Sequence, residues 1–204
     1  MTSSGAFGPR ISGWLRRVPT WVVYLAGAVP GLLLVMAIFT GGLGADPVRT
    51  LEHRLGLLAL QFLLASLCIT PLLRFARINL VKFRKALGLL AFGYVVMHFT
   101  VWLLLDLQLR WGLIGAEIVK RPYLTLGFAA FLALIPLAAT SFQKAKKALG
   151  AQGWARLHRL VYLAMILGSV HFVMQEKVWT TESLLYLTLA IVLVGMRLLW
   201  IRRW

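Results

Sequence analysis

Six long apolar stretches constrain the fold of this chain more than any other feature. They cover residues 21–40, 55–73, 86–105, 123–140, 160–174 and 184–199 of the 204. A helix that crosses a bilayer needs about 20 mostly apolar residues, so six crossings would leave room only for short loops. Apolar residues make up 60% of the chain, against roughly 45–50% in a soluble domain. The pattern predicts an all-α integral membrane protein, with a six-helix transmembrane bundle over residues 21–204 and a cytoplasmic N-terminal segment over residues 1–20.

The charged residues divide between the two sides of this predicted bundle. One side carries 16 of the 22 basic residues, namely Arg10, Arg16, Arg17, Arg74, Arg77, Lys82, Arg84, Lys85, Lys144, Lys146, Lys147, Arg156, Arg159, Arg197, Arg202 and Arg203. The other side carries the remaining basic residues, Arg49, Arg54, Arg110, Lys120, Arg121 and Lys177, together with all six acidic residues. Because cytoplasmic loops are enriched in Lys and Arg, this asymmetry predicts that both chain ends lie in the cytoplasm.

The same distribution argues against two classes of function. A formal net charge of +16 would suggest nucleic acid in a soluble protein. Here the basic residues flank apolar stretches, so they indicate membrane topology, with lipid as the partner and no nucleic acid. In addition, no predicted span contains Asp, Glu or a mid-membrane Lys or Arg, and such residues are usual in ion-coupled transporters. The chain has one cysteine, Cys68, so an intrachain disulfide is excluded.

Two histidines lie inside predicted spans at matching depth. His98 is 13 residues after Lys85, and His171 is 12 residues after Arg159. At 1.5 Å of rise per residue, these spacings place the two side chains about 19.5 and 18 Å from the basic side of the membrane. The helices run in the same direction, so we expect His98 and His171 to lie at one level in the half of the membrane opposite the basic side.

A pair of histidines at one level can hold a metal between two helices. A bare zinc ion needs three or four protein ligands, and no other histidine or acidic residue reaches this depth. A haem iron needs only two axial ligands because the porphyrin supplies the other four, so the number of ligands fits haem. The alternative, of about equal weight from these residues alone, is that each histidine separately forms a hydrogen bond to a neighbouring helix.

The other two histidines lie near the membrane surfaces. His158 is 13 residues before His171, which corresponds to about 19.5 Å along one helix and places it at the basic interface. Arg84 and Lys85 lie at the same level, and their charges would suit haem propionates or a flavin phosphate. Setting the membrane topology is an equally good explanation for these charges. His53 lies at the opposite interface, where we expect a solvated residue rather than a ligand.

The sequence around these residues is similar to a known family over nearly all of the chain from about Asp46 onward. The similarity rests on the segments DPV at 46–48, ASLCITPL at 65–72, RKALGL at 84–89, EIVKRPYLTLG at 117–127 and LHRLVY at 157–162. It also rests on the 60-residue gap from His98 to His158 and the 13-residue step to His171. With these features the chain resembles the haem-binding membrane subunits of the bacterial periplasmic methionine-sulfoxide reductase system, in the wider ferric-reductase-like transmembrane group.

This resemblance implies a location, cofactors and partners. It implies a multi-pass protein of the bacterial inner membrane with one or two b-type haems on His98, His158 and His171. It further implies that the subunit passes electrons outward to a periplasmic molybdopterin enzyme, which reduces oxidised methionines in other proteins. The family is linked to the quinone pool as electron donor, and to bound FMN and a cytosolic flavin reductase. The relatives in the wider group that bind two haems carry two histidines on each ligand helix, whereas the third span here offers only His98.

Three hypotheses follow for the function. The first is a non-catalytic electron-transfer subunit, because the chain encodes no soluble flavin or nicotinamide domain and both donor and final catalyst would be other molecules. The second is a self-contained haem-dependent ferric or quinone reductase. The third is a membrane transporter or assembly factor without redox chemistry.

Overall fold

The computed structural model describes residues 7–201, and every regular element in that range is a helix. Arg202, Arg203 and both chain ends, which the charge pattern places in the cytoplasm, lie outside the described residues. In chain order the elements are α1 (Phe7–Arg17), α2 (Thr20–Phe39), α3 (Pro47–Phe75), the 3-10 helix η2 (Val81–Phe83), α4 (Arg84–Val101), the π-helix η3 (Trp102–Asp106), α5 (Trp111–Lys120), α6 (Pro122–Ala139), α7 (Gln143–Leu157), α8 (Leu160–Gln175) and α9 (Thr181–Ile201).

The predicted all-α membrane architecture is confirmed, with five or six spans among the described residues. Five segments are long and apolar enough to cross a bilayer: Thr20–Phe39, Pro47–Phe75, Val81–Asp106, Pro122–Ala139 and Thr181–Trp200. The sixth span requires α7 and α8 together, and these two helices are bent by 41° relative to each other. Helix α8 alone has 16 residues, in agreement with the short fifth stretch expected from residue 160.

Some helices lie where the sequence predicts only loops. Helix α1 occupies the predicted N-terminal segment, and α5 and α7 occupy predicted connections. Helix α7 is interrupted at Gly150, where a φ of 68° is readily adopted because glycine has no Cβ. Helix α3 begins at Pro47 rather than near residue 55, because the Asp46 carboxylate accepts the Arg49 N–H and Pro47 suits the first helical position.

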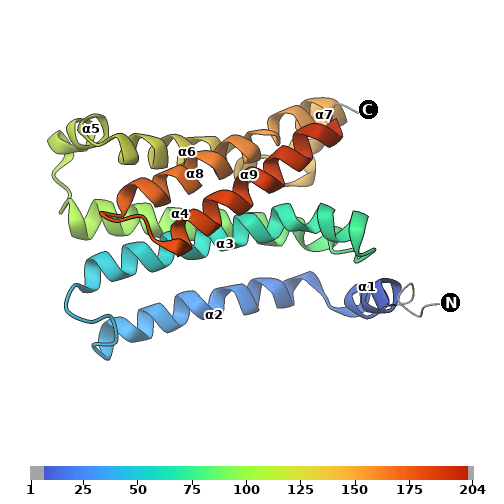
Figure 1. Ribbon diagram of the computed structural model, residues 1–204, viewed down its shortest axis with the longest axis horizontal. Helices are drawn as coiled ribbons and strands as arrows, with labels where there is room; N and C mark the ends of the chain where they lie inside the picture. Colours follow the sequence, from blue (N-terminus) through green and yellow to red (C-terminus); the bar gives the residue numbers. More distant parts are fainter. Residues whose placement is uncertain (1–6, 202–204) are drawn as a thin grey trace.

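The connections gather at two opposite ends of the bundle (Figure 1). Helix α1, the α3–α4 connection and α7 lie at one end, which we call the basic end because it carries the majority of Lys and Arg. Helix α5 and the α2–α3 and α8–α9 connections lie at the other end, called the acidic end because it carries the acidic residues. The structure therefore separates the charges as the sequence predicts, while the assignment of the basic end to the cytoplasm stays a prediction.

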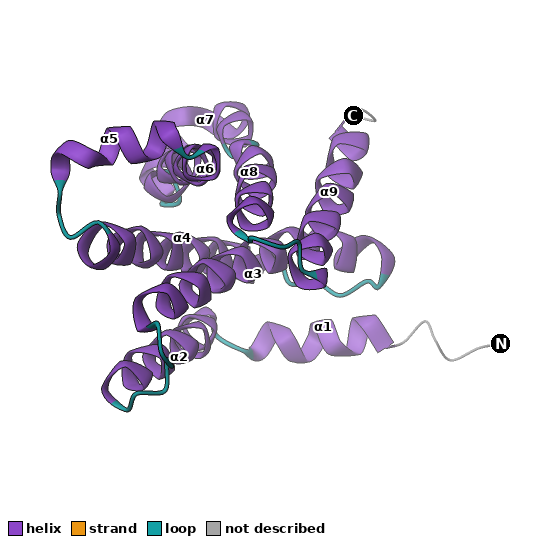
Figure 2. Ribbon diagram, turned by 60° about the vertical axis from the view of Figure 1, so that its left-hand side comes forward, coloured by secondary structure: helices purple, strands orange, loops and turns teal. Residues whose placement is uncertain are grey.

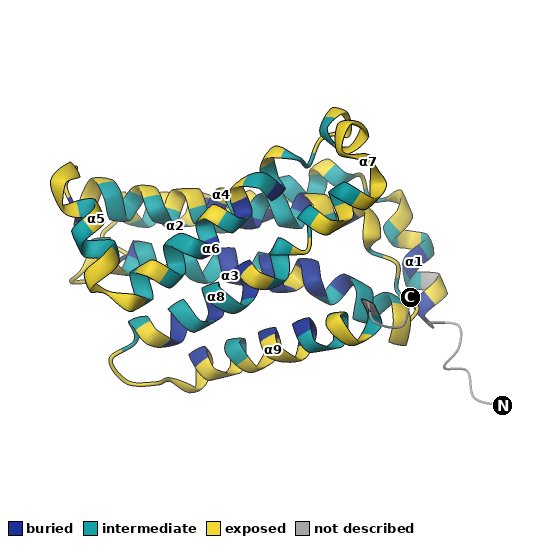
Figure 3. Cartoon of the chain, turned by 90° about the horizontal axis from the view of Figure 1, so that it is seen from above, coloured by how far each residue is buried: buried dark blue, intermediate teal, exposed yellow. Residues whose placement is uncertain are grey.

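The bundle is built from two closely packed helix pairs. Helix α3 packs along α4 and α6 packs along α8, and these pairs contact each other much less (Figure 2). Helix α9 packs on α8, and α2 packs on α4. The core, which includes Leu63, Leu67 and Met165, lies between the pairs, whereas α2 and α9 expose apolar side chains outward (Figure 3). Such exposed apolar faces are expected where helices contact lipid.

Helix α2 is tethered to the bundle by one tyrosine. The Tyr94 hydroxyl accepts the Gly31 N–H at 2.9 Å and donates to the Gly27 carbonyl at 2.7 Å. It thereby takes the place of a hydrogen bond between residues i and i+4 within α2. A Cβ on Gly27 would lie 2.4 Å from the Leu90 side chain, so this glycine allows α2 and α4 to approach closely.

Candidate functional site

A cavity of about 580 Å³ lies between the two helix pairs and opens toward the acidic end. Its size falls within the range of about 300–1,000 Å³ that is usual for ligand pockets. The deep part of the cavity is apolar, with walls that include Leu60, Leu63 and Leu134. Aromatic side chains line the side between α4 and α6, namely Phe99, Trp102, Phe128 and Phe131. The cavity can therefore hold a large apolar group with one edge near the membrane surface.

His98 and His171 lie on opposite walls of this cavity, close enough to agree with the common level that their spacings predict. His98 belongs to α4 and His171 to α8, so each pair of helices contributes one histidine. Their ring centroids are 6.2 Å apart, and the ring planes are inclined by 73°. Both rings are half-buried because one edge of each borders the cavity. The structure thus brings the two predicted ligands together.

Each of these imidazoles donates a hydrogen bond to a backbone carbonyl. The Nδ1–H of His98 donates to the Glu52 carbonyl of α3 at 2.8 Å, and the Nδ1–H of His171 donates to the Tyr123 carbonyl of α6 at 2.7 Å. A carbonyl oxygen can only accept, so Nδ1 must carry the proton in both neutral rings. The lone pair of each ring is therefore on Nε2, which is the arrangement that metal-binding histidines use.

The separation of the two rings fits a metal ion held between them. A bond of about 2.0–2.1 Å from metal to imidazole nitrogen, plus about 1.1 Å from that nitrogen to the ring centre, gives about 6.3 Å between two opposed ring centres. The observed distance is 6.2 Å. Among residues 7–201, no group of three or more His, Cys, Asp or Glu side chains could hold a bare metal ion. Two ligands beside a large apolar cavity fit a haem, whose porphyrin supplies the other four.

The mouth of the cavity is lined by charged residues of both signs. Arg49, Arg121 and Lys177 contribute positive charge, and Glu52 and Asp106 contribute negative charge. Glu117 pairs with Arg121 at 2.9 Å. Within residues 7–201, the buried Oε1 atom of Glu52 lacks a hydrogen-bond partner. The mouth can therefore contact polar or charged groups, in contrast to the apolar interior.

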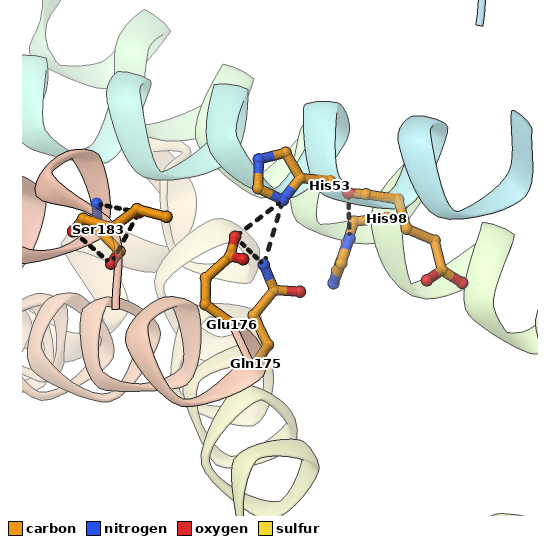
Figure 4. Close-up of polar contacts among 7 residues, drawn as sticks. His53, His98, Gln175, Glu176 and Ser183 are labelled. Atoms are coloured by element: carbon orange, nitrogen blue, oxygen red, sulfur yellow. Dashed lines mark hydrogen bonds and ion pairs between the residues drawn. The ribbon is translucent and has the colours of Figure 1, made fainter. Parts of the chain in front are cut away.

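His53 also lines this cavity. Figure 4 shows its contacts with Gln175 and Glu176. Its Nδ1 is 3.1 Å from Gln175 Nε2 and 3.6 Å from Glu176 Oε1, and its ring lies 5.5 Å from that of Phe172. These contacts join α3 to the end of α8. The side chain is about one-third exposed, at 34%. Its place in the cavity wall was not expected from the sequence, and its position at a membrane interface stays a prediction.

His158 is separate from the other two predicted ligands. It lies in the turn between α7 and α8, and its ring stacks on Trp154 with centroids 3.9 Å apart. The Thr140 hydroxyl donates to the Pro136 carbonyl, so it must accept the Nε2–H of His158 at 3.1 Å. The structure thus places His158 at the basic end, as predicted, with one face and one nitrogen already in contact with neighbours.

The other predicted site residues, Arg84 and Lys85, differ from each other. Arg84 Nη2 donates to the Thr70 hydroxyl at 2.7 Å, whereas Lys85 is exposed. Arg197 was not expected at this site, but it reaches inward from α9 and donates to the Leu67 carbonyl at 3.2 Å. In the described part of the chain, the buried Nε atoms of both arginines have no hydrogen-bond partner. The inward position of Arg197 depends on how α9 packs against the bundle, so it could be found only in the structure.

Comparison with known proteins agrees with this fold. The family model described as "Ferric reductase like transmembrane component" matches residues 54–169, which is more than half of the chain. A relative from Agrobacterium fabrum is 47% identical over 178 residues, covering 87% of this chain and 82% of the relative. A relative from Brucella ovis is 43% identical over 190 residues, covering 93% and 84%. Both relatives are named "Protein-methionine-sulfoxide reductase heme-binding subunit MsrQ".

The chain is therefore a multi-pass membrane protein of the ferric-reductase-like transmembrane family, and within that family it belongs to the MsrQ group.

Proposed function

We propose that this chain is the haem-bearing electron-transfer subunit of a methionine-sulfoxide reductase system in the bacterial inner membrane. It would pass electrons from the quinone pool or a flavin donor to a periplasmic molybdopterin-containing reductase that repairs oxidised proteins. The single observation that carries this proposal is the His98–His171 pair, with both Nε2 lone pairs free and a ring separation that matches two metal bonds. The names of the relatives support it.

The residues of the cavity would perform distinct tasks in this function. A b-type haem held there would supply one-electron redox chemistry. His98 and His171 would hold it from opposite walls, and the Glu52 and Tyr123 carbonyls would fix the protons on the two Nδ1 atoms. The apolar interior would exclude water from the site, since its walls are largely Leu and aromatic side chains.

The acidic end would face the periplasm and bind the partner enzyme. The cavity opens at that end, so an electron would have a short path from there to an external protein. Residues 41–54 and 106–122 surround the mouth and would form the docking surface. This arrangement follows from the charge asymmetry, because it places the basic end in the cytoplasm.

Electron uptake would occur at the basic end. His158, Arg84 and Lys85 lie there, and Arg197 adds a second inward-reaching guanidinium group. Free guanidinium N–H groups form charge-assisted hydrogen bonds to anions, which suits the propionates of a second haem or the phosphate of FMN. A quinone near His158 is the alternative occupant of this region.

Stopped-flow spectroscopy tests the proposed transfer to a partner. We expect the reduced chain to be reoxidised faster by the purified molybdopterin reductase than by buffer. Charge reversal at the docking surface, Lys120→Glu, should change the association rate at low salt, because charges at an interface rim act mainly on association. Lys147→Glu is the matched control, since Lys147 is also exposed but lies at the basic end. Equal rates with reductase and with buffer would overturn the proposal.

A self-contained ferric or quinone reductase is the second candidate. The open, charged mouth favours it, because Arg49, Arg121 and Lys177 would admit a small anionic chelate without a protein partner. Rapid reduction of ferric citrate by the purified chain, unchanged when the reductase is added, would support this candidate over the first.

A further inference from the structure

Each of the two cavity histidines rests on a glycine of the neighbouring helix. A Cβ built on Gly127 of α6 would lie 2.8 Å from Nδ1 and 2.9 Å from Cε1 of His171. A Cβ built on Gly56 of α3 would lie 3.3 Å from the same two atoms of His98. The His171 imidazole therefore occupies the space where any other residue at position 127 would carry its Cβ. The His98 imidazole leaves room for a Cβ at position 56 only as a tight contact, which a shift of a few tenths of an ångström would relieve.

The two glycines occupy equivalent positions relative to the hydrogen-bond acceptors. Gly56 is four residues after Glu52, and Gly127 is four residues after Tyr123, the residues whose carbonyls accept the histidine protons. In an α-helix the carbonyl of residue i points toward the N–H of residue i+4. Each carbonyl has a second lone pair, and at these two positions a Cβ on residue i+4 would lie against the imidazole that uses it. A glycine at i+4 therefore opens a helical carbonyl to an imidazole from outside.

We propose that Gly56 and Gly127 are positioning residues for the two haem ligands, an inference that rests on the function proposed above. The pairs Glu52–Gly56 and Tyr123–Gly127 form two equivalent carbonyl–glycine cradles. Each cradle keeps the proton on Nδ1 of one histidine, sets the plane of its ring and directs Nε2 into the cavity. One cradle belongs to each helix pair, α3 with α4 and α6 with α8. The histidine on one helix of each pair is therefore oriented by the helix that packs along it.

The alternative is that these glycines only allow close helix packing, as small residues commonly do in membranes. Gly27 has that role in this chain, since a Cβ there would meet Leu90 rather than a histidine. A packing role would change stability when alanine is introduced. A positioning role would also change the protonation and orientation of a particular imidazole, and these properties can be measured directly.

The first experiment uses haem-free full-length protein with 15N-labelled histidine. NMR of the ring nitrogens should show the Nδ1–H tautomer for His98 and His171 in the wild type. Gly127→Ala should lose this tautomer preference at His171 alone, and Gly56→Ala should shift it less, at His98 alone. Gly93→Ala on α4 is the matched control, because its added Cβ would have no atom within 4 Å. An Nε2–H tautomer of His98 and His171 in the wild type would contradict the proposed role of the cradles. This outcome does not depend on whether the protein binds haem.

The second experiment uses the haem-loaded protein. We expect Gly127→Ala to bind haem about tenfold or more weakly, as is usual when a partner of a metal ligand is disturbed. Its low-spin electron paramagnetic resonance signal should shift, with a smaller shift for Gly56→Ala and none for Gly93→Ala. Wild-type signals and affinity in both cradle variants would overturn the inference. If Gly127→Ala does not accumulate, Gly56→Ala decides the question. Wild-type protein without low-spin haem would instead overturn the proposed function.

Discussion

The two ends of the bundle present their histidines in opposite ways. At the acidic end, His98 and His171 donate to backbone carbonyls through Nδ1, and both residues line a cavity. At the basic end, His158 donates its Nε2 proton to Thr140 and stacks on Trp154. At the acidic end, the protons of these two imidazoles therefore lie on Nδ1, whereas His158 at the basic end carries its proton on Nε2, from which it donates to Thr140.

The unpartnered polar atoms differ in the same way. Within residues 7–201, the acidic end leaves one buried acceptor, Oε1 of Glu52, and the basic end leaves two buried donors, Nε of Arg84 and Nε of Arg197. The two ion pairs found in that range, Glu117–Arg121 and His53–Glu176, are both at the acidic end. Under the proposed function, this difference suits the acidic end to a metal group held by neutral imidazoles and the basic end to an anionic group.

Reporter fusions test which end of the bundle faces the cytoplasm, and their expected effect is all-or-none. Fusions after Gly44, Trp111 and Glu182 should be active only as periplasmic reporters, because these residues belong to the acidic end. Fusions after Asn79 and Gly150 should be active only as cytoplasmic reporters. A cytoplasmic signal after Trp111 would reverse or break this model.

Removal of one acidic-end ligand should have the largest spectral effect. His98→Ala and His171→Ala should each abolish the low-spin haem spectrum or convert it to a high-spin one, because a single protein ligand then remains. His158→Ala is the matched control and should retain the low-spin spectrum of the acidic-end haem. The measurement is the optical spectrum of the purified protein, oxidised and dithionite-reduced. A normal low-spin spectrum at full occupancy in both acidic-end variants would contradict the pairing.

His158→Ala should act on electron uptake instead. Loss of the imidazole should slow reduction by a quinol or by a flavin reductase, because the proposed uptake region loses its only histidine. The check is the rate of haem reduction in stopped flow, with dithionite as the donor that bypasses this region. Reduction at the wild-type rate with unchanged cofactor content would make His158 an ordinary interfacial residue.

Arg84→Gln should weaken binding of an anionic cofactor at the basic end. A hydrogen bond to a charged group contributes about 1.5–3 kcal/mol, so the affinity for FMN or a second haem should fall about tenfold or more. Lys147→Gln is the control, since Lys147 of α7 is exposed at the same end of the bundle and has no role in the proposed uptake region. Equal cofactor content in the two variants would mean that Arg84 serves packing or topology alone.

Thr140→Val should have the smallest effect. It removes the acceptor of the His158 proton and should lower the free energy of unfolding by about 0.5–1.5 kcal/mol. Thr188→Val is the control, because the exposed Thr188 hydroxyl bonds only to the Leu184 carbonyl of its own helix. Thermal unfolding in detergent compares the two variants. A change in the acidic-end haem spectrum of Thr140→Val would show that the two ends are not independent.

Much of the fold follows from sequence because membrane helices obey strong local rules. A backbone in lipid must form its own hydrogen bonds, so an apolar stretch of span length becomes a helix whatever its neighbours are. Because the rise per residue is fixed, counting from the basic residues at the membrane surface places His98 and His171 at one level. For the same reason the short fifth span and the position of His158 at the basic end were predictable.

Other features depend on the rotation of each helix about its axis and on the helices that pack against it. These features were visible only in the tertiary structure. Depth along a helix does not determine which way a side chain points. The distance of 6.2 Å between the ring centroids of His98 and His171 therefore depends on how α4 and α8 pack. The acceptors of their protons are backbone atoms of α3 and α6, which carry no sequence signal. The glycines that expose these carbonyls, and the inward reach of Arg197, likewise depend on contacts between residues far apart in the chain.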